Sequence, residues 1–221
     1  AVALYSIEKD IAEIAETQKK ILTFLEVENE SQIEADVETL MGIVTNYKYN
    51  WDNELSVSSS HQSIMDIQNR ARKNMIAYQK RVNEVVSSKP FVVNKSKANS
   101  TLSDLEKKFK YYRLSLYTFS LASLMEIMLS GNFKEEYIAK IRDDIKTVSD
   151  TYRDQFEKGS LYLEKLGAVG VEANIVKGIG TAGKAFAVLA NPGTGVLVEK
   201  MEDMIQIYNH TSQICFDNEK I

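Results

Sequence analysis

FKYYRLSLYTFSLASLMEIML, residues 109–129, is the stretch that decides the fold. Apolar and aromatic residues lie on every side of a helical wheel drawn through it, and no residue between Arg113 and Glu126 is charged. A helix that is apolar all round must be buried all round, either in a protein core or in a bilayer. A membrane-spanning helix needs about 20 apolar residues, and these two charged residues bracket a shorter run. We therefore predict that this helix is the centre of an all-α bundle.

The composition agrees with long helices. The chain has 221 residues, enough for one elongated domain, and only two prolines. The net charge of −4 argues against general nucleic-acid binding. The single Cys215 excludes an internal disulfide, and residues 1–20 lack the apolar core of a signal peptide, which leaves a cytoplasmic and a secreted location open.

The charges are distributed unevenly along the chain. Residues 1–40 hold ten acidic and three basic residues, whereas residues 70–113 hold twelve basic and three acidic ones. One interpretation is that the two segments lie side by side and neutralise each other. The other is a basic face for anionic lipid or an acidic partner.

The first two expected helices carry apolar seams at alternating spacings of three and four, which is the pattern of a coiled-coil contact. The seam of residues 4–25 consists of Leu4, Ile7, Ile11, Ile14, Gln18, Ile21 and Leu25. It is already in register at residue 1, which favours the interpretation that the chain is part of a longer protein. The second seam consists of Ile33, Val37, Leu40, Val44, Tyr47 and Trp51, after a capping pattern at Ser31 and Glu34. The sequence leaves open whether these two helices form a hairpin or one kinked rod.

Three further long helices and a short one are expected. We expect a serine-rich turn at residues 56–60, a third helix ending at Lys89-Pro90, and a fourth from Thr101 to the Gly131 cap. The fifth runs from a cap at Asn132 to about residue 166, antiparallel to the fourth because the connection is short. A final short helix around residues 201–208 precedes a polar tail at 209–221. We predict one domain: an elongated antiparallel bundle of about five long helices plus the short C-terminal one.

The segment at residues 167–198, GAVGVEANIVKGIGTAGKAFAVLANPGTGVLV, differs from the rest of the chain. It holds seven of the ten glycines, and Asn191-Pro192-Gly193 in it is a strong turn signal. It is the candidate membrane or partner segment, through the residues Ile179, Phe186, Val188, Leu189, Pro192, Val196, Leu197 and Val198.

Three interpretations of this segment remain open. It is a permanently packed connection, a membrane-inserting hairpin stored against the bundle, or a phosphate-binding loop. Its apolar arms are shorter than the roughly 20 residues of a spanning helix. The glycine spacing at Gly178, Gly180 and Gly183 matches a dinucleotide loop, but that motif belongs in a βαβ unit, which nothing here predicts.

The layout of long helices with a late, small-residue apolar segment resembles the α-helical pore-forming toxins of the cytolysin A and haemolysin BL type. Three stretches also resemble the C-terminal part of uncharacterised bacterial helical proteins: EIAETQKKIL, YYRLSLYTFSLASL and KGIGTAGKAFAVLANPGTGVLVEKM. The first resemblance implies a membrane-active bundle. The second brings no known activity.

No residue pattern indicates catalysis. His61 and His210 lie in an expected turn and an expected tail, and neither belongs to a zinc or di-iron motif. The aromatic residues Tyr111, Tyr112, Tyr117 and Phe119 are candidates to line a ligand pocket, although aromatics at helical spacing usually form core.

We therefore expect a non-enzymatic bundle without a cofactor or metal, which engages a membrane or a protein partner through the Gly-rich segment. The alternative is a cytoplasmic structural or protein-interaction bundle in which the segment stays packed. The helical seams would also suit homo- or hetero-oligomers.

Overall fold

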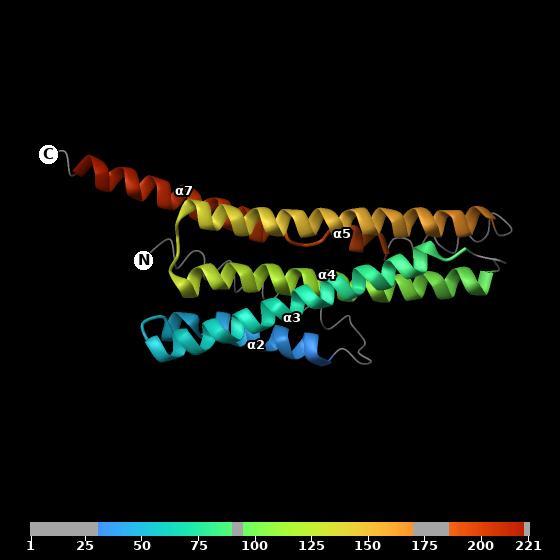
Figure 1. The fold of residues 1–221 in the computed structure, drawn as a ribbon, viewed down its shortest axis with the longest axis horizontal. Helices are drawn as coiled ribbons and strands as arrows, with labels where there is room; N and C mark the ends of the chain where they lie inside the picture. The colour runs from blue at the N-terminus through green and yellow to red at the C-terminus, as the bar shows by residue number, and fades with distance from the viewer. Residues whose placement is uncertain (1–30, 90–94, 170–185, 219–221) are drawn as a thin grey trace. The chain divides into compact units, whose positions relative to one another are not determined.

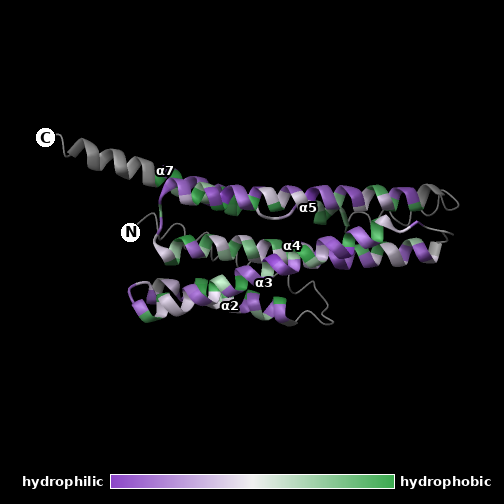
Figure 2. Cartoon of the chain, in the orientation of Figure 1, coloured by the Kyte–Doolittle hydropathy of each residue, from purple (hydrophilic) through white to green (hydrophobic). Residues whose placement is uncertain are grey.

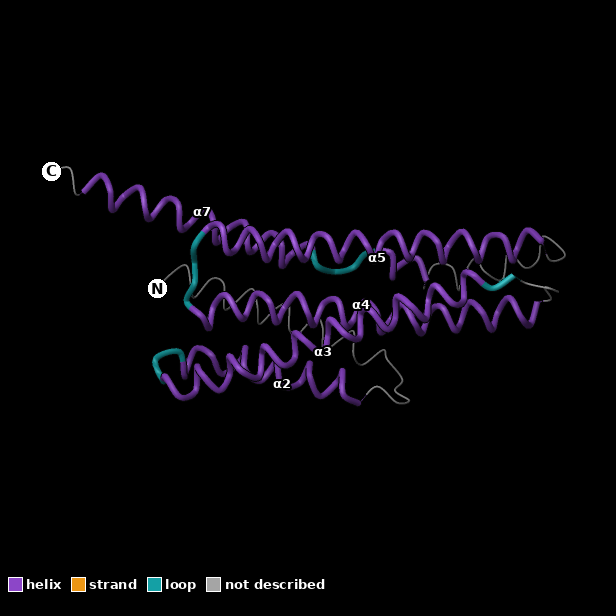
Figure 3. Tube along the Cα trace, in the orientation of Figure 1, coloured by secondary structure: helices purple, strands orange, loops and turns teal. Residues whose placement is uncertain are grey.

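The computed structural model describes residues 31–89, 95–169 and 186–218, and these residues are almost entirely helical. The helices are α2 (Ser31–Asn50), α3 (Glu54–Ser87), α4 (Lys95–Ser130), α5 (Glu135–Val169) and α7 (Gly195–Asn218), with a 3-10 turn η1 (Val188–Ala190) between the last two (Figure 1). None of the described residues forms a strand (Figure 3). The all-α bundle is thus confirmed. The expected helix at residues 4–25 and its seam lie outside the described residues.

Two compact units share the long helices. Among the described residues, unit 1 comprises residues 31–71, 118–146 and 194–218, and unit 2 comprises residues 72–89, 95–117, 147–169 and 186–193. Helices α3, α4 and α5 each contribute one part to unit 1 and the other part to unit 2. Hydrophilic and hydrophobic residues alternate along α3 and α5 (Figure 2), as expected of helices with one face against a core.

The core of unit 1 forms where α2 and α3 meet the C-terminal half of α4. The apolar residues buried here are Ile33, Val37, Leu40 and Val44 of the predicted seam in α2, and Ile64, Ile67 and Ala71 of α3. Asp36 is buried among them, and its carboxylate accepts hydrogen bonds from Nε and Nη2 of Arg70, with Nη2 at 2.7 Å. This pair joins the acidic and basic segments of the sequence at one point.

Residues 114–125 of α4 are buried on every side, as predicted. Two of the buried hydroxyls within this stretch bond within their own helix. Ser115 Oγ donates to the Tyr111 carbonyl at 2.9 Å, and Ser123 Oγ donates to the Phe119 carbonyl at 2.8 Å. These two serines therefore enter the core without leaving an orphaned donor.

Helices α4 and α5 are antiparallel, as predicted. The contact pairs Glu126–Tyr137, Tyr112–Tyr152 and Phe109–Phe156 advance in opposite directions along the two helices. Gly131, with φ of +62°, ends α4 in the left-handed conformation expected of a glycine cap.

Four details of the sequence prediction are wrong. The serines at 56–60 are helical, because Asn53 caps α3 by accepting a hydrogen bond from the Ser56 amide at 3.1 Å. Trp51 was expected to be the last residue of the second helical seam, but it follows the end of α2 and is 64% exposed, so it is not a core residue. Helix α4 begins at Lys95 rather than Thr101. The last helix is not short: α7 has 24 residues and continues through residues 209–218, which were expected to belong to the polar tail.

Candidate functional site

The described part of the Gly-rich segment begins with an aromatic anchor in unit 2. Phe186 is buried and stacks on Phe156, with ring centroids 4.7 Å apart. Its edge meets the ring of Phe109 of α4 at 5.7 Å. Edge-to-face and offset-stacked aromatic rings contribute about 0.5–1.5 kcal/mol per pair beyond their buried area. Phe186 is therefore a core residue of unit 2.

A buried hydrogen bond fixes the next turn of the segment. The Tyr152 hydroxyl of α5 donates to the Leu189 carbonyl at 2.6 Å, and both residues are buried. Burial raises the pKa of the Tyr152 hydroxyl, so that it stays a donor to pH values above the ordinary tyrosine pKa of 10. The bond satisfies a carbonyl of η1 that has no partner within a regular helix.

The predicted turn at residues 191–193 is confirmed. Gly193 has φ of +78°, and its amide donates to Oδ1 of Asn191 at 2.9 Å. A Cβ atom at Gly193 would lie 3.4 Å from Nη2 of Arg113. Glycine is needed here for its left-handed backbone, whereas the flexible end of the Arg113 side chain lies at ordinary contact distance.

The candidate residues of the segment divide into anchors and exposed residues. Phe186, Leu189, Pro192 and Leu197 are buried, Val198 is half-buried, and Val188 and Val196 are 64% and 49% exposed. Within unit 2, Ala187, Val188, Ala190 and Asn191 form an exposed edge, which we call the η1 edge. Val196 belongs to the first turn of α7 in unit 1. Ile179 and the glycines at 178–183 lie outside the described residues.

The aromatic residues considered as pocket lining are core. Tyr111, Tyr112, Tyr117 and Phe119 are all buried. The Tyr111 ring stacks on Tyr78 at 5.8 Å. Burial raises the pKa of Tyr112 to about 12, and it also raises the pKa of Tyr117. The rings of these aromatic residues pack as core.

His61 lies on α3 rather than in a turn, and it faces a polar cluster in unit 1. Its Nε2 atom is buried without a hydrogen-bond partner, 4.0 Å from Oε1 of Glu126. The same carboxylate accepts a hydrogen bond from the Tyr137 hydroxyl. Burial and this carboxylate together raise the pKa of Tyr137. Within the described ranges, no three His, Cys, Asp or Glu side chains are grouped as metal ligands would be.

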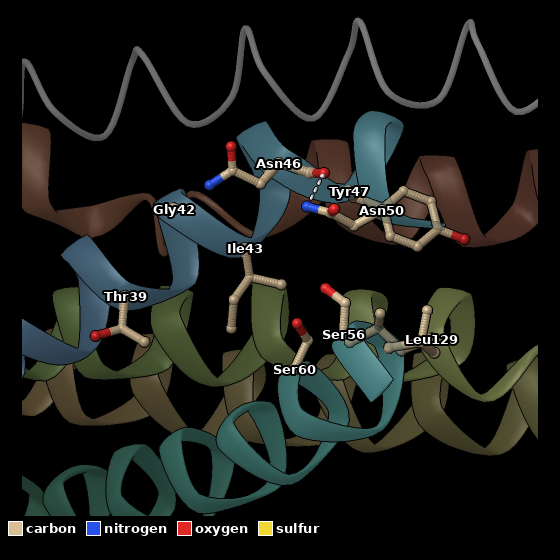
Figure 4. A pocket seen from close by; sticks show the side chains of 10 residues that line it. Thr39, Gly42, Ile43, Asn46, Tyr47, Asn50, Ser56, Ser60 and Leu129 are labelled. Carbon is tan, nitrogen blue, oxygen red and sulfur yellow. Dashed lines mark hydrogen bonds between the residues drawn. The ribbon is translucent and has the colours of Figure 1, made fainter. Parts of the chain in front are cut away.

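A pocket of ≈ 270 Å³ lies in unit 1 beside the connection of α2 and α3 (Figure 4). Ile43 of α2 points toward α3, and the hydroxyls of Ser56 and Ser60 of α3 point toward α2. The remaining lining residues are Thr39, Gly42, Asn46, Tyr47, Asn50, Val57 and Leu129. The lining is thus uncharged, with apolar side chains and hydrogen-bonding groups in the same cavity.

The sequence argument missed both the pocket and the His61 cluster. The His61 cluster joins His61 to Glu126 and Tyr137, which lie far from it in the sequence, so no local residue spacing predicts the cluster. The pocket had one signal, Gly42 in the middle of an otherwise regular helical seam.

In the part of the chain that the structure describes, no helix combines the length and apolar character required to cross a membrane. No family model, curated protein or solved structure matches this chain.

Proposed function

We propose that this chain is a non-enzymatic helical bundle that binds a protein partner through the η1 edge, while Phe186 and Leu189 stay packed in unit 2. The observation that carries the proposal is the double anchoring of the segment, by the Phe186 ring and by the Tyr152–Leu189 hydrogen bond. A segment fixed at both points presents its exposed residues in one conformation, which lowers the entropic cost of binding.

The cost of releasing the segment supports this proposal over membrane insertion. Exposing a buried Phe or Leu side chain costs about 1.5–3 kcal/mol each. Breaking the buried bond from Tyr152 would leave polar groups unsatisfied, at a further cost of about 1–3 kcal/mol. A partner that binds the edge without moving the anchors avoids these costs.

The η1 edge suits a close protein contact. Three of its four side chains are Ala or Val, and the exposed Val188 stands among them. Small side chains let a partner approach the backbone closely, and Asn191 supplies a polar rim. This combination of an apolar centre and a polar margin is the usual anatomy of a protein interface.

Membrane engagement is the competing role, and the resemblance to pore-forming toxins implies it. The test uses the full chain with neutral and with anionic phospholipid vesicles, measuring co-sedimentation and dye leakage. We expect neither. Association that Phe186→Ala strengthens would overturn the proposal, because that substitution loosens the anchor.

A second experiment tests binding of a protein partner by comparing two charged substitutions in unit 2. Val188→Asp lies on the η1 edge, whereas Leu161→Asp lies on the outer face of α5, where Leu161 is 47% exposed. We expect a protein recovered from extracts of the native organism with the parent chain and with Leu161→Asp, but lost with Val188→Asp. Equal recovery with both variants contradicts binding through this edge.

A further inference from the structure

The pocket in unit 1 contains a glycine that the described structure does not account for. Gly42 lies in the interior of α2, where glycine costs roughly 1 kcal/mol relative to alanine. Its backbone is not in the left-handed region, and a Cβ atom there would have no neighbour within 4 Å. Neither a special backbone conformation nor crowding within the described bundle requires glycine. A glycine in such a place suits a chain that approaches the α2 backbone from outside.

Large apolar side chains are exposed at the adjoining end of the same two helices. Trp51 is 64% exposed and Leu55 is 82% exposed. They lie in the short α2–α3 connection and the first turn of α3, next to Asn50 and Ser56 of the pocket lining. We call the pocket and these two exposed residues together the α2–α3 groove.

The chain itself supplies a segment that needs such a groove. Residues 4–25 carry the seam of six apolar residues and one glutamine, and they end six positions before Ser31, the first residue of α2. A seam of this kind is stable as a helix only when it is buried against other helices. The five intervening residues, 26–30, match the length of an αα-hairpin connection. The tether also gives the segment an effective concentration that no free ligand has.

The register of such a hairpin can be counted. In an antiparallel hairpin that sets Leu25 level with Ser31, each residue before Leu25 is level with the corresponding residue after Ser31, because both helices rise about 1.5 Å per residue. Ile14 is eleven positions before Leu25, and Gly42 is eleven positions after Ser31, so the two are level. Ile7 and Leu4 then reach the level of Tyr49 and Asp52, on either side of Trp51.

We propose that residues 4–25 form an antiparallel hairpin with α2 and occupy the α2–α3 groove, with Ile14 over Gly42 and with Leu4 and Ile7 against Trp51 and Leu55. The missing side chain at Gly42 is the hole into which the Ile14 side chain fits. The uncharged lining accepts an aliphatic side chain without stranding a charge. The exposed Trp51 is then a docking residue for the first segment of its own chain.

Cysteine pairs in the full chain test the register. In a Cys215→Ser background, Ile14→Cys with Gly42→Cys should form a disulfide within one chain under mild oxidation, detected by non-reducing gel mobility and peptide mass. The matched control replaces Ser58, which is exposed on α3 outside the pocket lining, and Ile14→Cys with Ser58→Cys should not form the bond. The proposal is overturned by the same yield in both pairs, by no bond in either, or by a bond only between two chains.

Trp51 is the only tryptophan in the chain and reports on the same contact without a cross-link. Leu4→Ser with Ile7→Ser should shift its emission to longer wavelength and raise its quenching by acrylamide about twofold or more. Ile21→Ser is the control, because its level lies near Ala35, four helical turns from Trp51. Unchanged emission in the double variant contradicts the docking. Neither experiment involves the η1 edge, so the outcome is independent of the proposed partner.

Discussion

At the scale of single residues, α4 approaches α5 closely in the aromatic core of unit 2, where Phe109 lies against Gly159. A Cβ atom at Gly159 would lie 2.9 Å from Cε2 of Phe109. The Phe109 ring is fully buried and meets Tyr152, Phe156 and Phe186 edge-on. Because three other rings hold it, Phe109 has no free direction in which to move away. Glycine in the middle of α5 is therefore a packing requirement.

Gly159→Ala should destabilise the protein, although alanine is the better helix former. The gain in helix propensity is roughly 1 kcal/mol, and overpacking a filled core costs about 1–3 kcal/mol. We expect a net loss of up to about 2 kcal/mol in the free energy of unfolding, measured by urea titration with circular dichroism.

Phe109→Leu provides the control for that experiment, because the smaller side chain leaves room for the new methyl group. The two substitutions together should cost less than the sum of their separate effects. The packing argument is wrong if Gly159→Ala stabilises the protein, or if the effects of Gly159→Ala and Phe109→Leu on the free energy of unfolding simply add. Either result would mean that the Phe109 ring moves aside for the new methyl group.

At the scale of elements, the C-terminal half of α4 was the most predictable part of the chain. Its apolar residues cover every side of the helix, so only one environment fits it, whatever the arrangement of its neighbours. The ends of helices were less predictable. The start of α3 depends on the Asn53 cap rather than on the run of serines after it. The exposure of Trp51 followed from the end of α2 at Asn50, which the seam spacing does not encode.

Introducing a charge into α4 should destabilise the protein strongly at one serine and hardly at all at another. Ser120 is fully buried, and an unpaired carboxylate there should cost about 3–5 kcal/mol. Ser103, on the same helix, is exposed, and Ser103→Asp should change the stability by no more than about 0.5 kcal/mol. Urea unfolding of Ser120→Asp and Ser103→Asp compares the two sites in one element. Similar stabilities would contradict the burial of α4 on all sides.

At the scale of the whole molecule, buried tyrosines should make the protein sensitive to alkali. Burial raises the pKa of Tyr112 to about 12 from an ordinary value of 10, and it also raises the pKa values of Tyr117, Tyr137 and Tyr152. Above pH 10 the unfolded chain loses these protons while the folded protein keeps them. The stabilisation is therefore complete below pH 10 and is lost as the pH rises to 12.

The urea midpoint should fall steeply between pH 10 and pH 12, with tyrosinate absorbance appearing in the same step as unfolding. A shift of two pKa units corresponds to ~3 kcal/mol for Tyr112 alone. Tyr112→Phe should therefore make the decline shallower. Tyrosinate absorbance that rises near pH 10 in the still-folded protein would contradict the burial of these hydroxyls.

The candidate site was only partly predictable from the sequence. The turn at residues 191–193 was foreseen because Asn, Pro and Gly each have a specific backbone role in it. The division of the segment into anchors and exposed residues was not. Phe186 and Val188 are both apolar, and only the position of the Phe156 ring makes one of them core. The expectation of a membrane or protein partner stays a prediction, which the vesicle and recovery experiments decide.

The complete burial of the C-terminal half of α4 has a consequence for synthesis on the ribosome. Helices α2 and α3 emerge before α4, whereas α5 and α7 emerge after it. At about 5–20 residues per second, the 35 residues of α5 take roughly 2–7 s to translate. During that interval only some of the helices that bury α4 have been made. Its uncharged residues 114–125 are therefore partly exposed to solvent. Chains that terminate early, before α5, would keep that surface uncovered and should be substrates for chaperones and proteases.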